Sequence, residues 1–398
     1  MTSTSSPAHS RERAIILLTV LVDIIGFGIV IPVLPYFAES FGAGPTVITL
    51  LFSSFSFFSF LSSPFFGALS DRIGRRPVLI GSISVTAAGW FIVATGQSLW
   101  MIFLGRIIDG FAAGKITTAQ AYIVDISRDD RERTNNLGLF GAAFGIGFLL
   151  GPIIGGALSE LSPVFPFYCA AGLAVVNTIL AYFLLPETLT EKHTEPLLFN
   201  PLKPVTTAMR THAIRYNMLA WMFFGLAFVI TTAIFSLYVQ DQWGYTNLAT
   251  GLLFTVIGLV GFVNQTFLLR TFWSRRFTDH QLQNIMPVIL AIGLALLATG
   301  SLPIFILGLV LLGAGQGVFR VVVTSIVAGK APTHMKGEVM GVVGAVFSAC
   351  SVVGPILAGP LYESGHFFPY IAGAVFMVGA YFAALRSAKT EQEWVPLP

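Results

Sequence analysis

The chain has 398 residues, of which 55% are hydrophobic and only 10% are charged. Because an ordinary soluble domain is about 25% charged, this composition excludes a soluble globular protein and indicates an integral membrane protein. The net charge of +3 gives no reason to expect nucleic acid as a partner. In a membrane protein the informative feature is where each charge falls along the topology.

Twelve apolar windows follow one another along the chain, each about as long as the roughly 20 residues that a helix needs to cross a bilayer. We expect helical spans at roughly 14–38, 46–69, 77–97, 99–126, 136–158, 164–186, 216–239, 246–269, 284–300, 303–328, 338–361 and 367–386. The first window is too long for a signal peptide, so we interpret it as a span. The two cysteines, Cys169 and Cys350, lie inside apolar windows and are expected to be buried free thiols.

The basic residues predict the orientation of these spans. Nineteen of the 22 Lys and Arg lie in the terminal segments or in alternate loops, and the opposite set of loops has none. By the positive-inside rule, both termini face the cytoplasm. An even number of spans follows from that arrangement as well as from the hydrophobic windows.

A polar segment at 188–215 divides the chain into two halves of six spans, 1–187 and 216–398. Shifting the sequence by 203 residues aligns the fourth and fifth spans with the tenth and eleventh, so that Gly151 falls on Gly354 and Pro152 on Pro355. An internal duplication of this length is typical of transporters built from two bundles that move about a central site. We therefore predict two pseudo-symmetric six-helix bundles joined by a cytoplasmic linker.

The turn between the second and third spans carries the stretch GALSDRIGRRPVL. Here the sequence resembles the major facilitator superfamily, whose loop motif is matched by Gly67, Asp71, Gly74 and Arg75. The resemblance implies a gate motif at the cytoplasmic face, in which Asp71 touches the eleventh span. From the residues alone, Arg75 lies near the level of Asp125, with which it can pair. The alternative is that these charges only enforce orientation.

A second motif, GAAFGIGFLLGPIIGG at 141–156, is similar to the antiporter motif of drug and tetracycline exporters. The stretches DIIGFGIVIPVLP at 23–35 and LPETL at 185–189 are also similar to that branch. Glycines every four residues clear one helix face for close backbone approach, and a proline adds a bend. The residues of the antiporter motif are Gly147, Gly151, Pro152, Gly155 and Gly156, and Gly141 and Gly145 form a second such pair.

The fourth span carries buried charges. Arg106 and Asp109 lie three residues apart, on one helix face. The resemblance links the motif that starts at Arg106 to proton transfer; the alternative is a structural ion pair. Lys115 follows nine residues after Arg106, which in a continuous helix places it on the opposite face. A charge at that depth costs at least about 2.5 kcal/mol, and Asp23 in the first span is its simplest partner.

Arg320 in the tenth span has no acid of its own in the second half. Beside Lys115, it suggests an anionic group on the substrate; the alternative is a structural contact with Asp23 or helix-end carbonyls. Gln120 and Gln316 also lie inside spans and are candidate cavity residues. Unlike the tetracycline exporters that it resembles, the chain has no acid in its third or ninth span. Tetracycline itself is therefore not the substrate that we expect.

These patterns predict a proton-coupled exporter of small amphipathic molecules, working by alternating access, with Asp23, Arg106 and Asp109 in proton coupling. The alternatives are a carrier of organic anions or siderophore-like metabolites and, third, a non-transporting membrane sensor. The sequence contains no phosphate-binding loop and no metal-ligand spacing among its histidines. We expect no enzymatic activity, no cofactor beyond the proton gradient, no nucleic acid, and a monomer in the bacterial inner membrane.

Overall fold

The computed structural model describes residues 7–189, 214–330 and 336–388, and within these ranges all regular structure is helical. The first half contains α1 (Pro7–Val30), α2 (Leu34–Glu39), α3 (Pro45–Ile73), α4 (Arg75–Thr95), α5 (Leu99–Ala112), α6 (Lys115–Asp125), α7 (Asp130–Ser159) and α8 (Phe165–Leu184). The second half contains α10 (Arg215–Trp243), α11 (Asn247–Val263), the π-helix η1 (Asn264–Trp273), α12 (Ser274–Arg276), α13 (Asp279–Leu297), α14 (Leu302–Lys330), α15 (Lys336–Ser364) and α16 (Phe368–Ala388).

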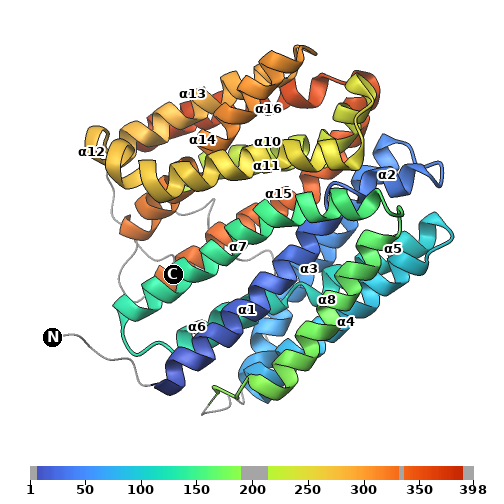
Figure 1. The fold of residues 1–398 in the computed structure, drawn as a ribbon. Coiled ribbons are helices and arrows are strands. Elements are labelled where there is room, and N and C mark those ends of the chain that lie inside the picture. Colours follow the sequence, from blue (N-terminus) through green and yellow to red (C-terminus); the bar gives the residue numbers. More distant parts are fainter. Residues whose placement is uncertain (1–6, 190–213, 331–335, 389–398) are drawn as a thin grey trace. The chain divides into compact units, whose positions relative to one another are not determined.

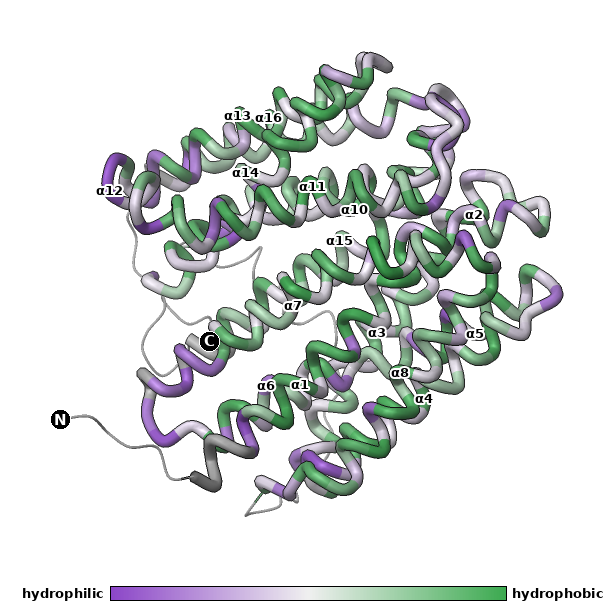
Figure 2. Tube along the Cα trace, viewed as in Figure 1, coloured by the Kyte–Doolittle hydropathy of each residue, from purple (hydrophilic) through white to green (hydrophobic). Residues whose placement is uncertain are grey.

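Eleven helices in the described residues are long and apolar enough to cross a membrane. The twelfth span is the fourth along the chain, which is divided between α5 and α6, so neither piece is long enough alone. Figure 2 shows the helices as largely hydrophobic along their length, with hydrophilic residues gathered in segments such as α12. The predicted all-α membrane fold of twelve spans is thus confirmed.

Three predicted spans differ from the continuous α-helices expected. The first ends at Val30, and a turn leads into the short helix α2, because Pro32 and Pro35 interrupt the backbone bonding of the window. The fourth breaks at Ala113 and Gly114. The eighth changes from α- to π-helical bonding at Asn264. In η1 the Asn264 side chain donates to the Ala314 carbonyl of α14 and accepts from Trp273 Nε1 at 2.7 Å.

The described residues form two compact units. Unit 1 comprises Met1–Gly42, Ser54–Phe199 and Thr246–Leu252, and unit 2 comprises Ala43–Ser53, Asn200–Tyr245 and Leu253–Pro398, counting only described residues within those limits. Two short segments, 43–53 and 246–252, therefore depart from a simple division of the chain into halves. Most of the predicted linker at 188–215 lies outside the described residues, so that boundary stays a prediction.

The same helix pairs recur in both units, as the internal repeat predicts. In unit 1, α1 packs on α7 and α4 packs on α5 and α8; in unit 2, α10 packs on α15 and α13 packs on α14 and α16 (Figure 1). The repeated glycines mark the same crossings. A Cβ at Gly105 would meet Val93 at 2.5 Å in α4, and one at Gly308 would meet the Gly293 carbonyl at 2.8 Å in α13.

The glycines of the antiporter motif bring α7 against α1. A Cβ on Gly147 would lie 2.5 Å from Ile24, and one on Gly151 would lie 2.6 Å from the Gly28 Cα atom. Gly155 approaches Ile29 equally closely, whereas Gly156 faces the first turn of α11. The predicted close backbone approach is therefore present along this stretch.

The second predicted pair of glycines behaves differently. Gly141 and Gly145 have nothing within 4 Å of an added Cβ. The expectation that they also allow close helix packing is wrong, because they lie on an open face of α7, while Phe140 and Ala143 on another face pack into the core of unit 1. Both cysteines are free as expected; Cys350 is buried, whereas Cys169 is only half-buried.

This contrast within one helix gives a matched test. We expect Gly151→Ala to lower stability by about 1–3 kcal/mol, since the methyl group must push α7 away from α1. Gly141→Ala should cost nothing, and the better helix propensity of alanine even favours it by up to about 1 kcal/mol. The melting temperatures of the two purified variants in detergent measure the difference. Equal melting temperatures would contradict the close α1–α7 contact.

Candidate functional site

An ion pair between α1 and α6 lies within unit 1. Lys115 Nζ is 2.7 Å from Asp23 Oδ1, and both side chains are largely shielded, with exposed fractions of 8% and 15%. This is the pairing that the cost of an isolated charge in hydrocarbon favours. It neutralises Lys115 at the first residue of α6, where the positive end of the helix dipole adds to the positive charge.

A second ion pair is buried on α5. Arg106 Nη1 is 3.2 Å from Asp109 Oδ2, as expected for charges three residues apart on one helix face. The guanidinium also lies over two aromatic rings, 4.2 Å from the centroid of Phe55 and 5.2 Å from that of Trp90. These faces carry partial negative charge and help to hold the cation. No partner among the described residues reaches the buried Arg106 Nε.

A hydroxyl group joins the two ion pairs. Lys115 Nζ donates to Thr86 Oγ1 at 2.5 Å, and the Thr86 hydroxyl also interacts with the Asp109 carboxylate. Thr86 belongs to α4 and is buried. We call Asp23, Lys115, Asp109 and Arg106, together with Thr86 between them, the charge network. Sequence reasoning missed Thr86, since nothing in its stretch, VTAAGW, distinguishes it from threonines that bond to their own helix.

The interruption between α5 and α6 is slight, because Ala113 and Gly114 both keep right-handed helical backbone angles. Counting residues along a continuous helix put Lys115 on the face opposite Arg106, and the two side chains do have different neighbours: Lys115 contacts Asp23 of α1, whereas Arg106 lies over Phe55 of α3. Gly110 and Gly114 both lie directly against α3, where any side chain would clash. Gly110 faces Phe55, and Gly114 faces Ser62 and Phe66.

The remaining predicted cavity residues lie apart from the charge network. Gln120 on α6 is exposed. Gln316 on α14 is half-buried and lines a small cavity of unit 2 beside Phe224, Phe228 and Met377. The Arg320 side chain is exposed, and no acidic partner for it is found among the described residues.

The gate motif forms a cluster at the end of α3. Arg75 Nε is 3.0 Å from Asp125 Oδ2, so the expected pair is present, and Arg75 Nη1 also contacts Asp71 at 2.5 Å and Ser70 at 2.6 Å. Asp71 lies within the last turns of α3, which continues to Ile73, rather than after the helix end as expected. The predicted contact of Asp71 with the eleventh span stays a prediction.

The stretch LPETL, noted in the sequence only as a resemblance, has a structural role. Glu187 accepts hydrogen bonds from the backbone N–H groups of Arg75 at 2.9 Å and Arg76 at 3.2 Å. These are amides at the start of α4, which have no partner within their own helix. Gly74 precedes them with a φ of +114°, and a side chain there would collide with the Glu187 carboxylate. The glycine of the gate motif is therefore required by this cap.

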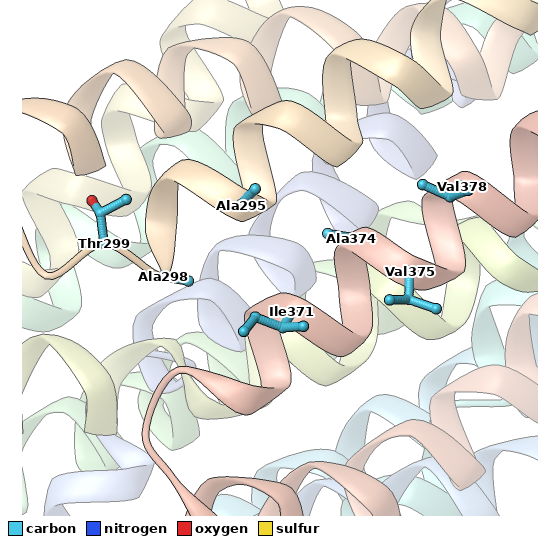
Figure 3. Close-up of a pocket in the computed structure, with 7 residues that line it drawn as sticks. All are labelled: Ala295, Ala298, Thr299, Ile371, Ala374, Val375 and Val378. Atoms are coloured by element: carbon cyan, nitrogen blue, oxygen red, sulfur yellow. The ribbon is translucent and has the colours of Figure 1, made fainter.

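A groove of about 460 Å³ lies elsewhere, between the outer part of α13 and the start of α16 (Figure 3). Its lining residues are Ala295, Ala298, Thr299, Ile371, Ala374, Val375 and Val378, which offer a single hydroxyl and no charge. None of its lining residues belongs to the charge network. Among the described residues, no group of His, Cys, Asp and Glu side chains is arranged to hold a metal ion.

The charge network can change its charge without a cofactor. Two carboxylates and two cations balance when all four groups are ionised, and one added proton leaves a net charge of +1 inside the membrane. Asp23 is the more accessible carboxylate, since its side chain is 15% exposed against 5% for Asp109.

Twelve spans in two repeated bundles with buried, balanced charges define a polytopic membrane transporter rather than an enzyme. The chain matches the family model of the Major Facilitator Superfamily over residues 16–299 and 267–398. It therefore belongs to the major facilitator superfamily and spans the membrane many times.

Curated relatives cover nearly the full length of the chain. The chain is 30% identical to the class C tetracycline resistance protein of Escherichia coli over 355 residues, which is 88% of this chain and 89% of the relative. It is 25% identical to the quinolone resistance protein NorA of Staphylococcus aureus over 362 residues, 89% of this chain and 90% of that protein.

Solved structures show the same fold at lower identity. A crystal structure of a POT family transporter has a TM-score of 0.80 at 14% identity, covering 96% of this chain and 97% of the other. The human organic anion transporter MFSD10 has a TM-score of 0.72 at 22% identity, covering 95% of this chain and all of the other.

The Asp23–Lys115 contact predicts a specific pattern of stability. Asp23→Asn leaves a buried ammonium without its carboxylate, and we expect a loss on the order of 3 kcal/mol. Adding Lys115→Met to that variant removes the unpaired charge and should recover most of the loss. Melting temperatures of the two single variants and the double variant form a thermodynamic cycle. Additive losses would show that the two side chains are not paired.

Proposed function

We propose that the protein is a proton-coupled exporter of small amphipathic molecules that works by alternating access. The observation that carries the proposal is the charge network in unit 1, because a transporter that exchanges substrate for protons needs a carboxylate that titrates inside the membrane. Asp23, held by Lys115, is the proton-linked carboxylate in this proposal. Arg106 and Asp109 take part in coupling, and the gate motif controls the cytoplasmic face.

Export as the direction of transport rests on the relatives. The two relatives are named for resistance to tetracycline and to quinolones, and removal of a compound from the cell is one route to resistance. We further propose that the protein is a monomer of the bacterial inner membrane with both termini in the cytoplasm, a topology that the basic loops favour. Tetracycline itself is disfavoured as the substrate, because the third span contributes Thr86 to the network instead of an acid.

The test uses purified protein in liposomes that contain a pH-sensitive dye. In the wild type, lipophilic cations added to one side should drive proton flux. Asp23→Asn should abolish that flux, since an amide takes up no proton at these pH values, and Asp23→Glu should retain part of it. Glu160→Gln, which removes an exposed carboxylate at the end of α7, is the matched control and should behave as wild type. Intact flux in Asp23→Asn would overturn the assignment of Asp23.

A second candidate function is the transport of an organic anion. It is favoured by Arg320, an exposed cation within α14 that has no acidic partner among the described residues. A guanidinium binds carboxylates and phosphates through two parallel hydrogen bonds. The MFSD10 structure, which shares the fold, is described as an organic anion transporter.

The two candidates differ in the charge of the transported molecule. If the substrate is an anion, Arg320→Gln should raise its KM about tenfold or more, since a charge-assisted contact worth about 1.5–3 kcal/mol is lost. Transport of lipophilic cations should be unchanged or faster. Arg275→Gln, at a basic residue of α12, controls for the loss of a positive charge. Anion transport that is insensitive to Arg320→Gln would remove this candidate.

A further inference from the structure

We propose that the Thr86 hydroxyl is a positioning group for proton coupling: it holds Lys115 between two carboxylates, so that protonation of Asp23 turns the ammonium toward Asp109. The inference rests on the proposed proton-coupled transport and names the residue that carries the coupling between the two ion pairs. Asp23 receives the proton, and Thr86 passes its effect to the Arg106–Asp109 pair.

The geometry gives the hydroxyl a defined direction. A threonine hydroxyl has one donor hydrogen and two acceptor lone pairs. Lys115 has only donors, so at 2.5 Å its ammonium must donate to Thr86 Oγ1. The single Thr86 hydrogen is then available to the Asp109 carboxylate, with which the side chain interacts. Thr86 thus lies between Lys115 and Asp109, with its oxygen accepting from the ammonium and its hydrogen free to turn toward the carboxylate.

The resting position of Lys115 depends on competition between two carboxylates. Asp23 contacts the ammonium directly at 2.7 Å, while Asp109 acts through the hydroxyl and is shared with Arg106. A proton that binds an Asp23 carboxylate oxygen removes the negative charge on one side of Lys115. The remaining attraction comes from Asp109, so the ammonium moves toward α5 while it keeps its hydrogen bond to Thr86. Asp109 is then shared between two cations, and its ion pair with Arg106 weakens.

Few other charges face this position. The elements packed on α4 are α5, α6 and α8, and within unit 1 they bring Arg106 and Asp109 from α5 and Lys115 from α6. Asp125, at the far end of α6, is held by Arg75. The sequence of α8 from Phe165 to Leu184 contains no carboxylate, lysine, arginine or histidine, and its titratable groups are Tyr168, Cys169 and Tyr182. The helix α1 supplies Asp23.

Because Thr86 and its neighbours are buried, a water molecule cannot easily take the place of its hydroxyl. Thr86 is 4% exposed, Asp109 is 4% exposed and Arg106 is 1% exposed. Water is therefore largely excluded from the space between the two ion pairs. If the side chain at 86 lacked its hydroxyl, the electrostatic attraction would remain, but the directed contact between Lys115 and Asp109 would be lost.

The experiment compares Thr86→Val with Thr86→Ser in the liposome assay and in a binding assay at several pH values. Valine keeps the shape and removes the hydroxyl, whereas serine keeps the hydroxyl. We expect Thr86→Val to weaken the pH dependence of substrate binding about tenfold, within the usual range of coupling free energies, and to leave the affinity at high pH nearly unchanged. Thr86→Ser should restore the wild-type pH profile.

The controls separate a coupling role from a structural one. Thr178→Val removes a hydroxyl in α8 that bonds only to its own helix at Ala174 and should leave the pH profile unchanged. If Thr86→Val does not fold, Thr86→Ala, which removes the hydroxyl without adding bulk, is measured in its place with the same expectation.

Two results overturn different statements. If Asp23→Asn stops proton flux while Thr86→Val and Thr86→Ser both keep the wild-type pH profile, the role of Thr86 is refuted and the proposed function stands. If Asp23→Asn keeps its proton flux, the proposed function fails, whatever Thr86 does. A uniform loss of affinity at all pH values in Thr86→Val would also refute coupling and assign the residue to packing alone.

Discussion

The cost of placing charge in hydrocarbon governs the organisation of unit 1. A single buried ion is too costly to hold, so each cation of the charge network lies beside a carboxylate, and the two ion pairs share one hydroxyl. The fourth span is interrupted between Ala112 and Lys115, and Lys115 at the start of the second piece contacts both Asp23 and Thr86. Close crossings at Gly110 and Gly114 press the two pieces against α3.

The two units use one packing plan with different chemistry. Glycines at equivalent positions mark the same helix crossings in both, as Gly105 and Gly308 do. The charge network has no counterpart in the described part of unit 2, where the 203-residue offset puts Leu309, Leu312 and Val318 at the positions of Arg106, Asp109 and Lys115. A buried amide cluster lies elsewhere in that unit. Gln283 donates to Asn217 at 2.7 Å, and Ser387 donates to the same oxygen. Duplication therefore preserved the scaffold, and the ionisable groups differ between the copies.

Much of this arrangement follows from sequence because charge neutrality and hydrophobic length leave few choices. The twelve spans, Asp23 with Lys115, Arg106 with Asp109, and Arg75 with Asp125 were all expected on those grounds. Thr86 was not, because a hydroxyl in a span usually bonds to its own helix, as Thr178 does. The helix break and the π-helix η1 were missed because apolar windows are alike whether their hydrogen bonding is regular or not. No acid of the second half could be placed inside a span beside Arg320, so neutrality alone could not supply its partner.

The cap on α4 has a consequence for biosynthesis. Glu187 lies more than one hundred residues after the amides that it binds at Arg75 and Arg76. While the ribosome is still making the first five spans, the start of α4 has no carboxylate to cover it, and the loop that holds Arg75 lacks its anchor. The sixth span must be inserted before Glu187 reaches the cytoplasmic surface. Closure of this loop therefore marks the moment at which the first half of the protein has been completely translated and can fold as a unit.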